Sequence, residues 1–517
     1  MKKTARNLFQ IMLAVLAAAL LGGCLYLNSL MPIITGYAAK NLASAVFISG
    51  REPADVEALD LHFSFIKFTR NRVDFEKQTV TSRFLWSKSI AAFREGYGVT
   101  LLRGSGKDKE AFLAQSWPLP SDGAATEIVR GGAPAALAAG DSALAAETVR
   151  GGAPAALAAG DSALPLAADE AEGTPPALTQ GDPAQSSATG DSALPRGDSA
   201  LAAGDSALAA RLEPVAQALV DERAYNGHPF AFIVLHKGAV VAERYDRGIG
   251  PGTRLLSWSM AKSFTNALTG IMAGDGMVDI HAPLDIPEWQ QDARKDITLN
   301  DLLQMQSGLE WNEDYGNRSD VNLMLHRETD MGAFALSKPL RYTPGTHWYY
   351  SSGTTNIVMR WLRSRFPSDE AFLTYLHDRL FKPLGFRNPY FEPDMSGTPV
   401  GSSYLYATAR DYARFGQMYL DDGCVAGERI LPEGWVDYTV TPASDSKGGY
   451  GAFFWLNRDK SIADAPEDMF SCFGHDGQRI FIIPSKELVA VVLGYSNLPD
   501  HMIAFDRLLQ DILAQLP

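Results

Sequence analysis

The chain has 517 residues, with 46 Lys or Arg and 60 Asp or Glu, so its formal net charge is −14. This acidic balance argues against a nucleic-acid partner, because no excess of cations is available to neutralise phosphates. A hydrophobic content of 46% is typical of a folded protein, and the length allows about two to four domains. Three cysteines, Cys24, Cys424 and Cys472, lack the spacing of a metal site or a disulfide framework. Cys424 and Cys472 either pair with each other or pack in a core.

Residues 1–27 predict an export segment. Three cations among the first six residues precede an apolar run at 8–21, which is typical of a signal peptide or an N-terminal anchor. The run ends in LGGC, which resembles a bacterial lipoprotein signal with Cys24 as the lipidated residue. Apolar character continues to Leu27, so the run is also long enough to span a bilayer. We expect an exported protein, tethered to the membrane on the periplasmic or outer-surface side of the cell envelope.

A repetitive insert separates two regions of ordinary composition. Residues 127–146 are almost duplicated at 147–166, and the sequence GDSAL occurs five times up to residue 208. No aromatic residue lies within 121–210, so this stretch cannot bury enough apolar surface to offset the entropy of ordering it. We predict a disordered linker over 121–210. It divides a small N-terminal region, 28–120, from a larger C-terminal domain, 211–517.

The two regions differ in how much their patterns reveal. In the first, alternation over 61–68 predicts a strand with a partner at 73–80, and no chemistry is evident. The C-terminal domain begins with a predicted hairpin and continues with helices and late strands. These are strands at 230–235 and 240–245, helices at 259–272, 299–304, 355–365, 369–380 and 409–420, strands at 479–483 and 488–493, and a helix at 502–516. Strands at both ends of the domain predict an α+β class with an antiparallel sheet.

One Ser-x-x-Lys pattern has a context suited to catalysis. The pattern occurs three times, at 64–67, 259–262 and 444–447, and the second of these opens a predicted helix. Residues three apart share a helix face, so Lys262 Nζ can reach Ser259 Oγ. A buried lysine can lose its proton and activate the serine, while free N–H groups at the helix start favour an oxyanion. A helix-capping serine beside a solvated lysine is the alternative.

The surroundings of Ser259 resemble the serine β-lactamase and penicillin-binding-protein superfamily. The resemblance rests on 258–263 (WSMAKS), 302–309 (LLQMQSGL) and 407–416 (ATARDYARFG), and it covers about 228–517. It is closest to the class C-like branch, with its 6-aminohexanoate-dimer hydrolase-like and esterase-type members. It implies an antiparallel sheet flanked by helices with a mainly helical subdomain. It also implies an acyl-enzyme on Ser259, a small-molecule or peptide-like amide or ester substrate, and no metal or organic cofactor.

The resemblance also suggests a second and a third catalytic element. Tyr350-Ser351-Ser352 matches the family's Tyr-x-Asn/Ser element. It implies that Tyr350 shares a proton with Lys262 and passes it to the leaving group, and that Ser352 orients Lys262 or the substrate. The family's Lys-Thr-Gly element is absent, and residues 474–478 (GHDGQ) stand in its place.

Two registers of this third element stay open. Either His475-Asp476-Gly477 is its equivalent, or Gly474 is the motif glycine and the His475 N–H is an oxyanion donor. Tyr315 is predicted to line the substrate pocket. The missing lysine keeps two other functions open, a D-Ala-D-Ala carboxypeptidase or weak β-lactamase, and a non-catalytic module that binds cell-wall material.

Overall fold

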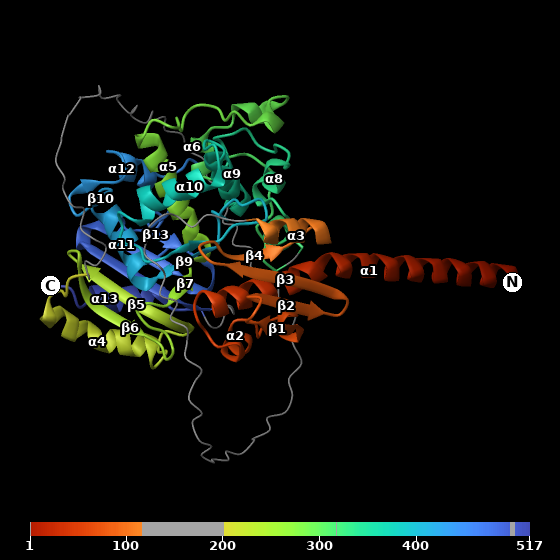
Figure 1. Ribbon diagram of the computed structural model, residues 1–517, viewed down its shortest axis with the longest axis horizontal. Helices are drawn as coiled ribbons and strands as arrows, with labels where there is room; N and C mark the ends of the chain where they lie inside the picture. The colour runs from red at the N-terminus through yellow and green to blue at the C-terminus, as the bar shows by residue number, and fades with distance from the viewer. Residues whose placement is uncertain (1, 116–200, 317, 497–501) are drawn as a thin grey trace, which may run out of the picture. The chain divides into compact units, whose positions relative to one another are not determined.

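The computed structural model describes residues 2–115, 201–316, 318–496 and 502–517, and the parts on both sides of the longest gap belong to one compact unit (Figure 1). In these residues a six-stranded antiparallel sheet has the strand order β12-β13-β14-β15-β5-β6. Because β15 pairs with β5, the last strands lie beside the predicted hairpin, which confirms the α+β class. The strands are β5 (His228–His236), β6 (Ala239–Tyr245), β12 (Trp455–Leu456), β13 (Phe470–Phe473), β14 (Arg479–Ile483) and β15 (Leu488–Tyr495).

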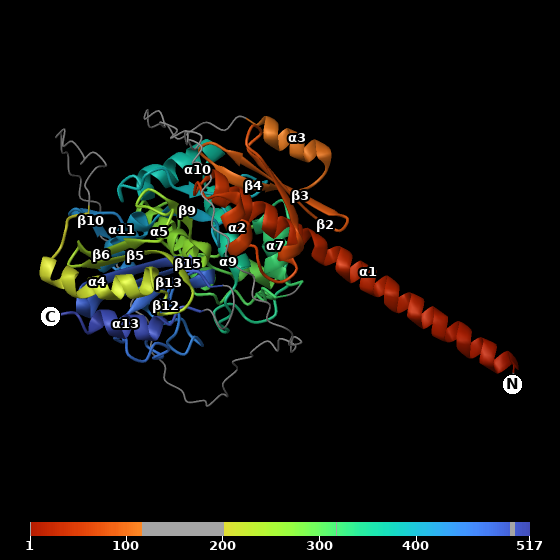
Figure 2. The same cartoon turned by 90° about the horizontal axis from the view of Figure 1, so that it is seen from below.

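Helices cover both faces of this sheet (Figures 1 and 2). Alternate residues of β5 point to opposite faces, so Phe232 and Val234 pack with α4 (Ser206–Val220) and α13 (Phe505–Leu513). The other face packs against α5 (Ala261–Gly274) and α11 (Ala409–Leu420).

Helix α4 begins before residue 210, the expected end of the linker. The Asp205 side chain caps the helix by accepting a hydrogen bond from the Ala207 N–H, and Leu208 is fully buried. The described part of the predicted linker, 201–210, is therefore folded, and a β-bridge also joins Ala203 to Val240. Linker residues 121–200 lie outside the described residues.

A second group of helices forms the predicted helical subdomain. They are α6 (Leu299–Leu303), α7 (Asp320–Arg327), α8 (Met331–Leu336), α9 (Ser352–Arg363) and α10 (Asp369–Leu376), which runs into a π-helical turn. The helices predicted at 299–304, 355–365 and 369–380 are confirmed, as is the one at 409–420. A small sheet with order β7-β9-β8 lies between this group and the N-terminal region. The remaining elements are β7 (Arg254–Leu256), β8 (Tyr390–Phe391), β9 (Leu405–Thr408), β10 (Cys424–Val425), β11 (Glu428–Arg429) and α12 (Trp435–Val440).

The N-terminal region folds as a long helix against a four-stranded sheet. Helix α1 runs from Lys2 to Phe47 and thus crosses the boundary expected at residue 27. The sheet has the order β1-β2-β3-β4, and α1 packs on it. The elements after α1 are α2 (Pro53–Leu59), β1 (Arg70–Asp74), β2 (Thr79–Phe84), β3 (Ser87–Arg94), β4 (Gly98–Leu102) and α3 (Gly106–Ala114).

The strand predicted over 61–68 is wrong. This segment is a turn followed by a short 3₁₀ helix, Ile66–Phe68, and Ser64 has a φ of 45°, which interrupts any extended run. Val73 and Val80, expected in a single partner strand, instead face each other across the β1–β2 pair. Alternation alone did not reveal that Leu61, Phe63 and Ile66 pack with α1 rather than on a sheet face.

Helix α1 has two halves of different character. In the first half, the apolar side chains that the structure describes are exposed, including Leu13 and Leu25. From Met31 on the helix is buried and carries polar residues that the folded body satisfies. Among the described residues, α1 is one helix long and apolar enough to cross a membrane, with a mean hydropathy of 2.1 in its most apolar window.

A buried ion pair joins the second half of α1 to the C-terminal domain. Lys40 binds the carboxylate of Glu392, and both side chains are almost fully inaccessible. Glu392 also accepts hydrogen bonds from Ser44 Oγ at 2.8 Å and from the Val99 N–H at 2.8 Å. Since a buried charge is costly without its partner, this pair fixes where α1 sits on the domain.

We expect Lys40→Met to destabilise the protein by about 3–5 kcal/mol, because it leaves Glu392 charged and unpaired in the interior. The melting temperature of the full chain in detergent should fall by about 10 °C. Lys40→Met with Glu392→Gln should recover most of that loss, since Gln is neutral. The control is Lys237→Met, which breaks an exposed pair with Glu487 and should change little. An unchanged melting temperature in Lys40→Met would contradict this account.

Candidate active site

Ser259 lies at the junction between a strand and a helix. The chain leaves β7, makes a 3₁₀ turn at Trp258–Met260 and continues as α5. Trp258 has a φ of 45°, an unfavourable conformation for a bulky residue, and its ring is held by contacts on several sides. Ser259 is partly exposed, while Lys262, one turn later, is 1% exposed. The predicted Ser-x-x-Lys arrangement on the first turn of a helix is present.

Lys262 is surrounded by three oxygen atoms. Its Nζ lies 2.9 Å from Ser259 Oγ, 3.0 Å from Ser352 Oγ and 3.1 Å from the Ser402 carbonyl oxygen. The Ser402 carbonyl can only accept a hydrogen bond. A neutral lysine has two hydrogens and one lone pair, so hydrogens directed at Ser352 and Ser402 leave the lone pair for the Ser259 hydroxyl. The geometry suits a base directed at Ser259.

Glu313 determines how Ser352 is used. Ser352 Oγ donates to Glu313 Oε1 at 2.5 Å, so the same oxygen presents a lone pair to Lys262. The Ser352 N–H, at the start of α9, also donates to this carboxylate, at 2.9 Å. Trp311 Nε1 and the Tyr315 hydroxyl donate to it at 2.5 and 2.7 Å. Glu313 was not predicted as a site residue, although it lies two positions before Tyr315.

Burial sets the protonation of Lys262. Desolvation lowers the pKa of Lys262 to about 8, and the Glu313 carboxylate acts in the opposite direction. Glu313 does not touch Nζ directly, because the Ser352 hydroxyl lies between them. About one tenth of Lys262 is therefore neutral at pH 7, far more than for an exposed lysine.

Tyr350 is the second titratable group beside Ser259. Lys262 Nζ lies 4.8 Å from the centre of the Tyr350 ring. Burial and the Glu313 carboxylate raise the pKa of Tyr350 well above its usual value, and a polar contact with Ser259 opposes this only in part. The phenol is consequently protonated at neutral pH and is available as a proton donor.

The other predicted residues divide into two groups. Tyr315 stacks on His475 with ring centres 5.5 Å apart, and the His475 ring meets Trp258 edge-on at 5.7 Å. These two residues therefore belong to the neighbourhood of Ser259. Gly477 instead packs against Ser496 and Ile503.

Gly474 has a structural reason to be glycine. Its N–H donates to the Gln478 carbonyl at 2.8 Å, so that N–H is already committed. A side chain at Gly474 would collide with the Ser257 carbonyl, two residues before Ser259. The backbone that leads into His475 therefore passes very close to the turn that carries Ser259.

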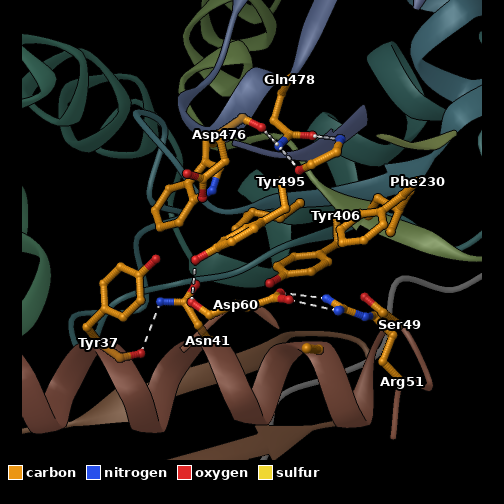
Figure 3. Close-up of a pocket in the computed structure, with 15 residues that line it drawn as sticks. Tyr37, Asn41, Ser49, Arg51, Asp60, Phe230, Tyr406, Asp476, Gln478 and Tyr495 are labelled. Carbon is orange, nitrogen blue, oxygen red and sulfur yellow. Dashed lines mark hydrogen bonds and ion pairs between the residues drawn. The ribbon is translucent and has the colours of Figure 1, made fainter. Parts of the chain in front are cut away.

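The N-terminal region contributes to the wall behind Ser259. Tyr37 of α1 stacks on Trp258, with ring centres 6.2 Å apart at an angle of 21°. A cavity of about 50 Å³ lies beside this contact, between α1 and the end of the central sheet (Figure 3). Figure 3 shows Asp476 and Tyr495 reaching toward α1, and the Tyr495 hydroxyl donates to the Asp60 carbonyl at 2.9 Å.

The cysteines take no part in this arrangement. All three are free, so the possible pairing of Cys424 with Cys472 is wrong, and Cys472 is buried in the core. Cys24 lies exposed on α1. In the described part of the chain no group of three His, Cys, Asp or Glu side chains is placed to hold a metal ion.

The comparison with known families agrees with this geometry. A family model described as Beta-lactamase matches residues 215–514, more than half of the chain. The chain belongs to the β-lactamase family. It is accordingly a serine hydrolase with the β-lactamase/transpeptidase-like fold, as the resemblance implied.

Individual relatives are hydrolases by name. Over 319 residues the chain is 28% identical to the 6-aminohexanoate-dimer hydrolase of Paenarthrobacter ureafaciens, covering 56% of this chain and 78% of that one. A Bacillus anthracis structure provisionally named 6-aminohexanoate-dimer hydrolase has a TM-score of 0.50 at 25% identity, covering 57% of this chain and 82% of that one. A family VIII carboxylesterase has a TM-score of 0.47 at 17% identity, covering 61% and 99%.

The rate at which a fluorophosphonate modifies Ser259 should rise as the pH increases through about 8, since Lys262 accepts a proton only when neutral. In Glu313→Gln the rising limb of the plot of labelling rate against pH should move to lower pH, because the variant lacks the carboxylate that raises the Lys262 pKa. The measurement is the labelling rate of the full chain, read by intact mass, from about pH 5 to about pH 10, which extends to both sides of the Lys262 pKa. Asp314→Asn, one residue along, is the control and should not move the limb. A limb that stays in place in Glu313→Gln would contradict the assigned electrostatics.

Proposed function

We propose that this chain is an exported, membrane-tethered serine hydrolase that cleaves an amide or ester through an acyl-enzyme on Ser259. The observation that supports it most is the buried Lys262, with Nζ 2.9 Å from Ser259 Oγ and its other hydrogens directed to acceptors. An inert helix cap would not require a lysine that is 1% exposed.

In the proposed acylation step, Ser259 Oγ attacks the substrate carbonyl carbon while its proton passes to Lys262 Nζ. The tetrahedral intermediate collapses by breaking the bond to the leaving group, and that group takes a proton from Tyr350, which Lys262 then reprotonates. Deacylation follows the reverse path. A water molecule attacks the acyl carbon while it gives a proton to the Lys262–Tyr350 pair. The bond to Ser259 Oγ then breaks, Ser259 Oγ takes a proton back from the pair, and the acid leaves. Protons balance over the cycle without a metal or redox partner.

The oxyanion requires two backbone donors, and we assign them to the Ser259 and His475 N–H groups. The close approach of Gly474 to the Ser257 carbonyl supports this register, because it brings the start of the 475–478 turn to the nucleophile. Gly477 is the less suitable choice, since it packs against Ser496 and Ile503.

The substrate class follows from what surrounds Ser259. The Tyr315–His475 stack forms a flat aromatic wall, and the cation of a Lys-Thr-Gly element is absent from the sequence. A linear amide or ester of small-molecule or peptide-like size suits this wall. The name of the Paenarthrobacter ureafaciens relative, 6-aminohexanoate-dimer hydrolase, supports the same class.

A D-Ala-D-Ala carboxypeptidase or weak β-lactamase is the second candidate. The exposed His475, when protonated, offers a positive charge in place of the missing lysine. Hydrolysis of penicillins or D-Ala-D-Ala peptides at rates above those of linear amides and esters would favour it.

Export and tethering rest on α1. Its first half contains an exposed apolar run, and three cations precede this run in the sequence. Both a lipid on Cys24 and a transmembrane span fit α1, because Cys24 is exposed and the helix is long enough to span a bilayer.

Treating the full chain with a fluorophosphonate should give one adduct, on Ser259. Ser259→Ala should abolish both the adduct and ester hydrolysis, and Lys262→Met should reduce kcat/KM by about 10³-fold or more, because the serine loses its base. Intact mass, peptide mapping and turnover of a chromogenic ester are the readouts.

The matched control is Ser444→Ala with Lys447→Ala, which removes another Ser-x-x-Lys pattern that lies in a loop. This variant should keep the adduct and the activity. A folded wild-type protein that forms no adduct would reject the hydrolase mechanism and favour a non-catalytic module that binds cell-wall material.

A further inference from the structure

The turn between β2 and β3 carries two large apolar residues, which are unfavourable in a turn that faces water. Phe84 pairs with Ser87, so Leu85 and Trp86 are the two central residues of a tight hairpin. Such turns favour Asn and Gly because they need a positive φ, and Leu85 has a φ of 49°. The two side chains are 66% and 60% exposed. Both the backbone strain and the exposure cost free energy, which indicates a function outside folding.

This turn lies where α1 changes from exposed to buried. Trp86 Nε1 donates to Asn28 Oδ1 of α1 at 3.0 Å. The residues just before Asn28, Leu25 to Leu27, are the last exposed apolar residues of the helix. From Met31 on, α1 belongs to the folded body. Whether the anchor is a transmembrane span or a lipid on Cys24, the edge of the bilayer falls at this level of α1.

Further apolar residues lie at the same end of the β1–β4 sheet. Arg70 pairs with Arg83 across β1 and β2, so the start of β1 lies beside the end of β2. Phe68 precedes Arg70 by two residues and is 58% exposed, and Phe65 is 59% exposed one turn earlier. We call Phe65, Phe68, Leu85 and Trp86 the interfacial patch.

The charge around the interfacial patch is opposite to that of the whole chain. Lys67, Arg70, Arg83 and Lys88 are all exposed and flank the patch. Neither 61–73 nor 79–94 contains an Asp or Glu, although the chain has a net charge of −14. Exposed aromatic residues ringed by cations are typical of a surface that binds anionic lipid headgroups.

We propose that the interfacial patch is a second membrane contact, which inserts Leu85 and Trp86 at the headgroup level of an anionic bilayer next to the point where α1 enters it. This contact goes beyond the hydrolase activity and rests on the proposed anchoring of α1. Two contacts fix the tilt of the folded body, and α1 is joined to the catalytic domain through Lys40 and Glu392. The active site is thereby held in one orientation to the membrane surface.

The test uses the full chain reconstituted into vesicles of phosphatidylcholine, with and without phosphatidylglycerol, whose acyl chains are brominated near the headgroup. Bromine quenches only tryptophans that contact lipid. The emission of Trp86 is the difference between the wild type and Trp86→Phe, which keeps the turn apolar. We expect brominated lipid to remove about half or more of this difference in vesicles with phosphatidylglycerol. Co-flotation with the vesicles shows separately that α1 is anchored.

Two variants test whether the quenching of Trp86 depends on the interfacial patch or on nonspecific binding of the protein to the vesicles. Arg83→Glu with Lys88→Glu should reduce the quenching of Trp86, most clearly in vesicles that contain phosphatidylglycerol. The control is Phe75→Ser, which removes a 65% exposed aromatic residue from the opposite end of the same sheet and should leave the quenching unchanged. Neither substitution touches the active site, so ester hydrolysis in detergent should stay at the wild-type level.

Three results would overturn the proposal. If anchored protein shows Trp86 emission quenched by aqueous acrylamide and not by brominated lipid, the turn faces water. If neither quencher acts, the turn is covered by protein, for example by a second copy of the chain. Equal quenching of Trp86 in the Arg83→Glu/Lys88→Glu variant would remove the role of the cations.

Discussion

The burial of Lys262 is the constraint on which the rest of the site depends. A lysine in the interior is unfavourable as a cation, so its pKa falls to about 8, and more of the amine is unprotonated and able to accept a proton near neutral pH. The surrounding oxygens then decide which way the lone pair points. Ser352 Oγ can serve as an acceptor toward Lys262 because its hydroxyl hydrogen is donated to Glu313. Glu313 does not contact Lys262, but through the Ser352 hydroxyl it directs the lone pair of Lys262 Nζ toward Ser259.

The N-terminal region is built into the hydrolase rather than appended to it. Tyr37 of α1 stacks on Trp258, which precedes Ser259 and has an unfavourable backbone conformation. Strain at Trp258 persists only where neighbouring groups hold it in place, and α1 supplies part of that support. A helix that begins with an exposed apolar stretch therefore ends as a structural part of the wall behind Ser259. Motion of this helix relative to the domain is limited by the Lys40–Glu392 pair.

Sequence patterns predicted β5, β6, β14 and β15 of the central sheet and the main helices, because their apolar periodicity is strong and each of these strands forms a hairpin with its neighbour in the chain. They did not predict the short strands β12 and β13. They also predicted the Ser259–Lys262 pair, since spacing of three on a helix is a local property. They missed Glu313, whose role depends on contacts with Ser352 across the fold, although its two-residue spacing from Trp311 and Tyr315 in an extended loop was a usable signal. The Ser402 carbonyl and the Tyr37 stack left no local signal at all. The error over 61–68 has the same cause, because its packing partner is α1.

The two buried lysines show how one residue type serves two purposes. Lys40 is in direct contact with the carboxylate of Glu392, an arrangement that favours a fixed position. Lys262 has the Glu313 carboxylate nearby, but the Ser352 hydroxyl lies between them. The carboxylate therefore stabilises the Lys262 cation without forming a salt bridge with it. A direct contact with Glu313 would raise the Lys262 pKa further and occupy its hydrogens in a salt bridge. One intervening hydroxyl is thus enough to separate a structural ion pair from a lysine that can exchange its proton with Ser259.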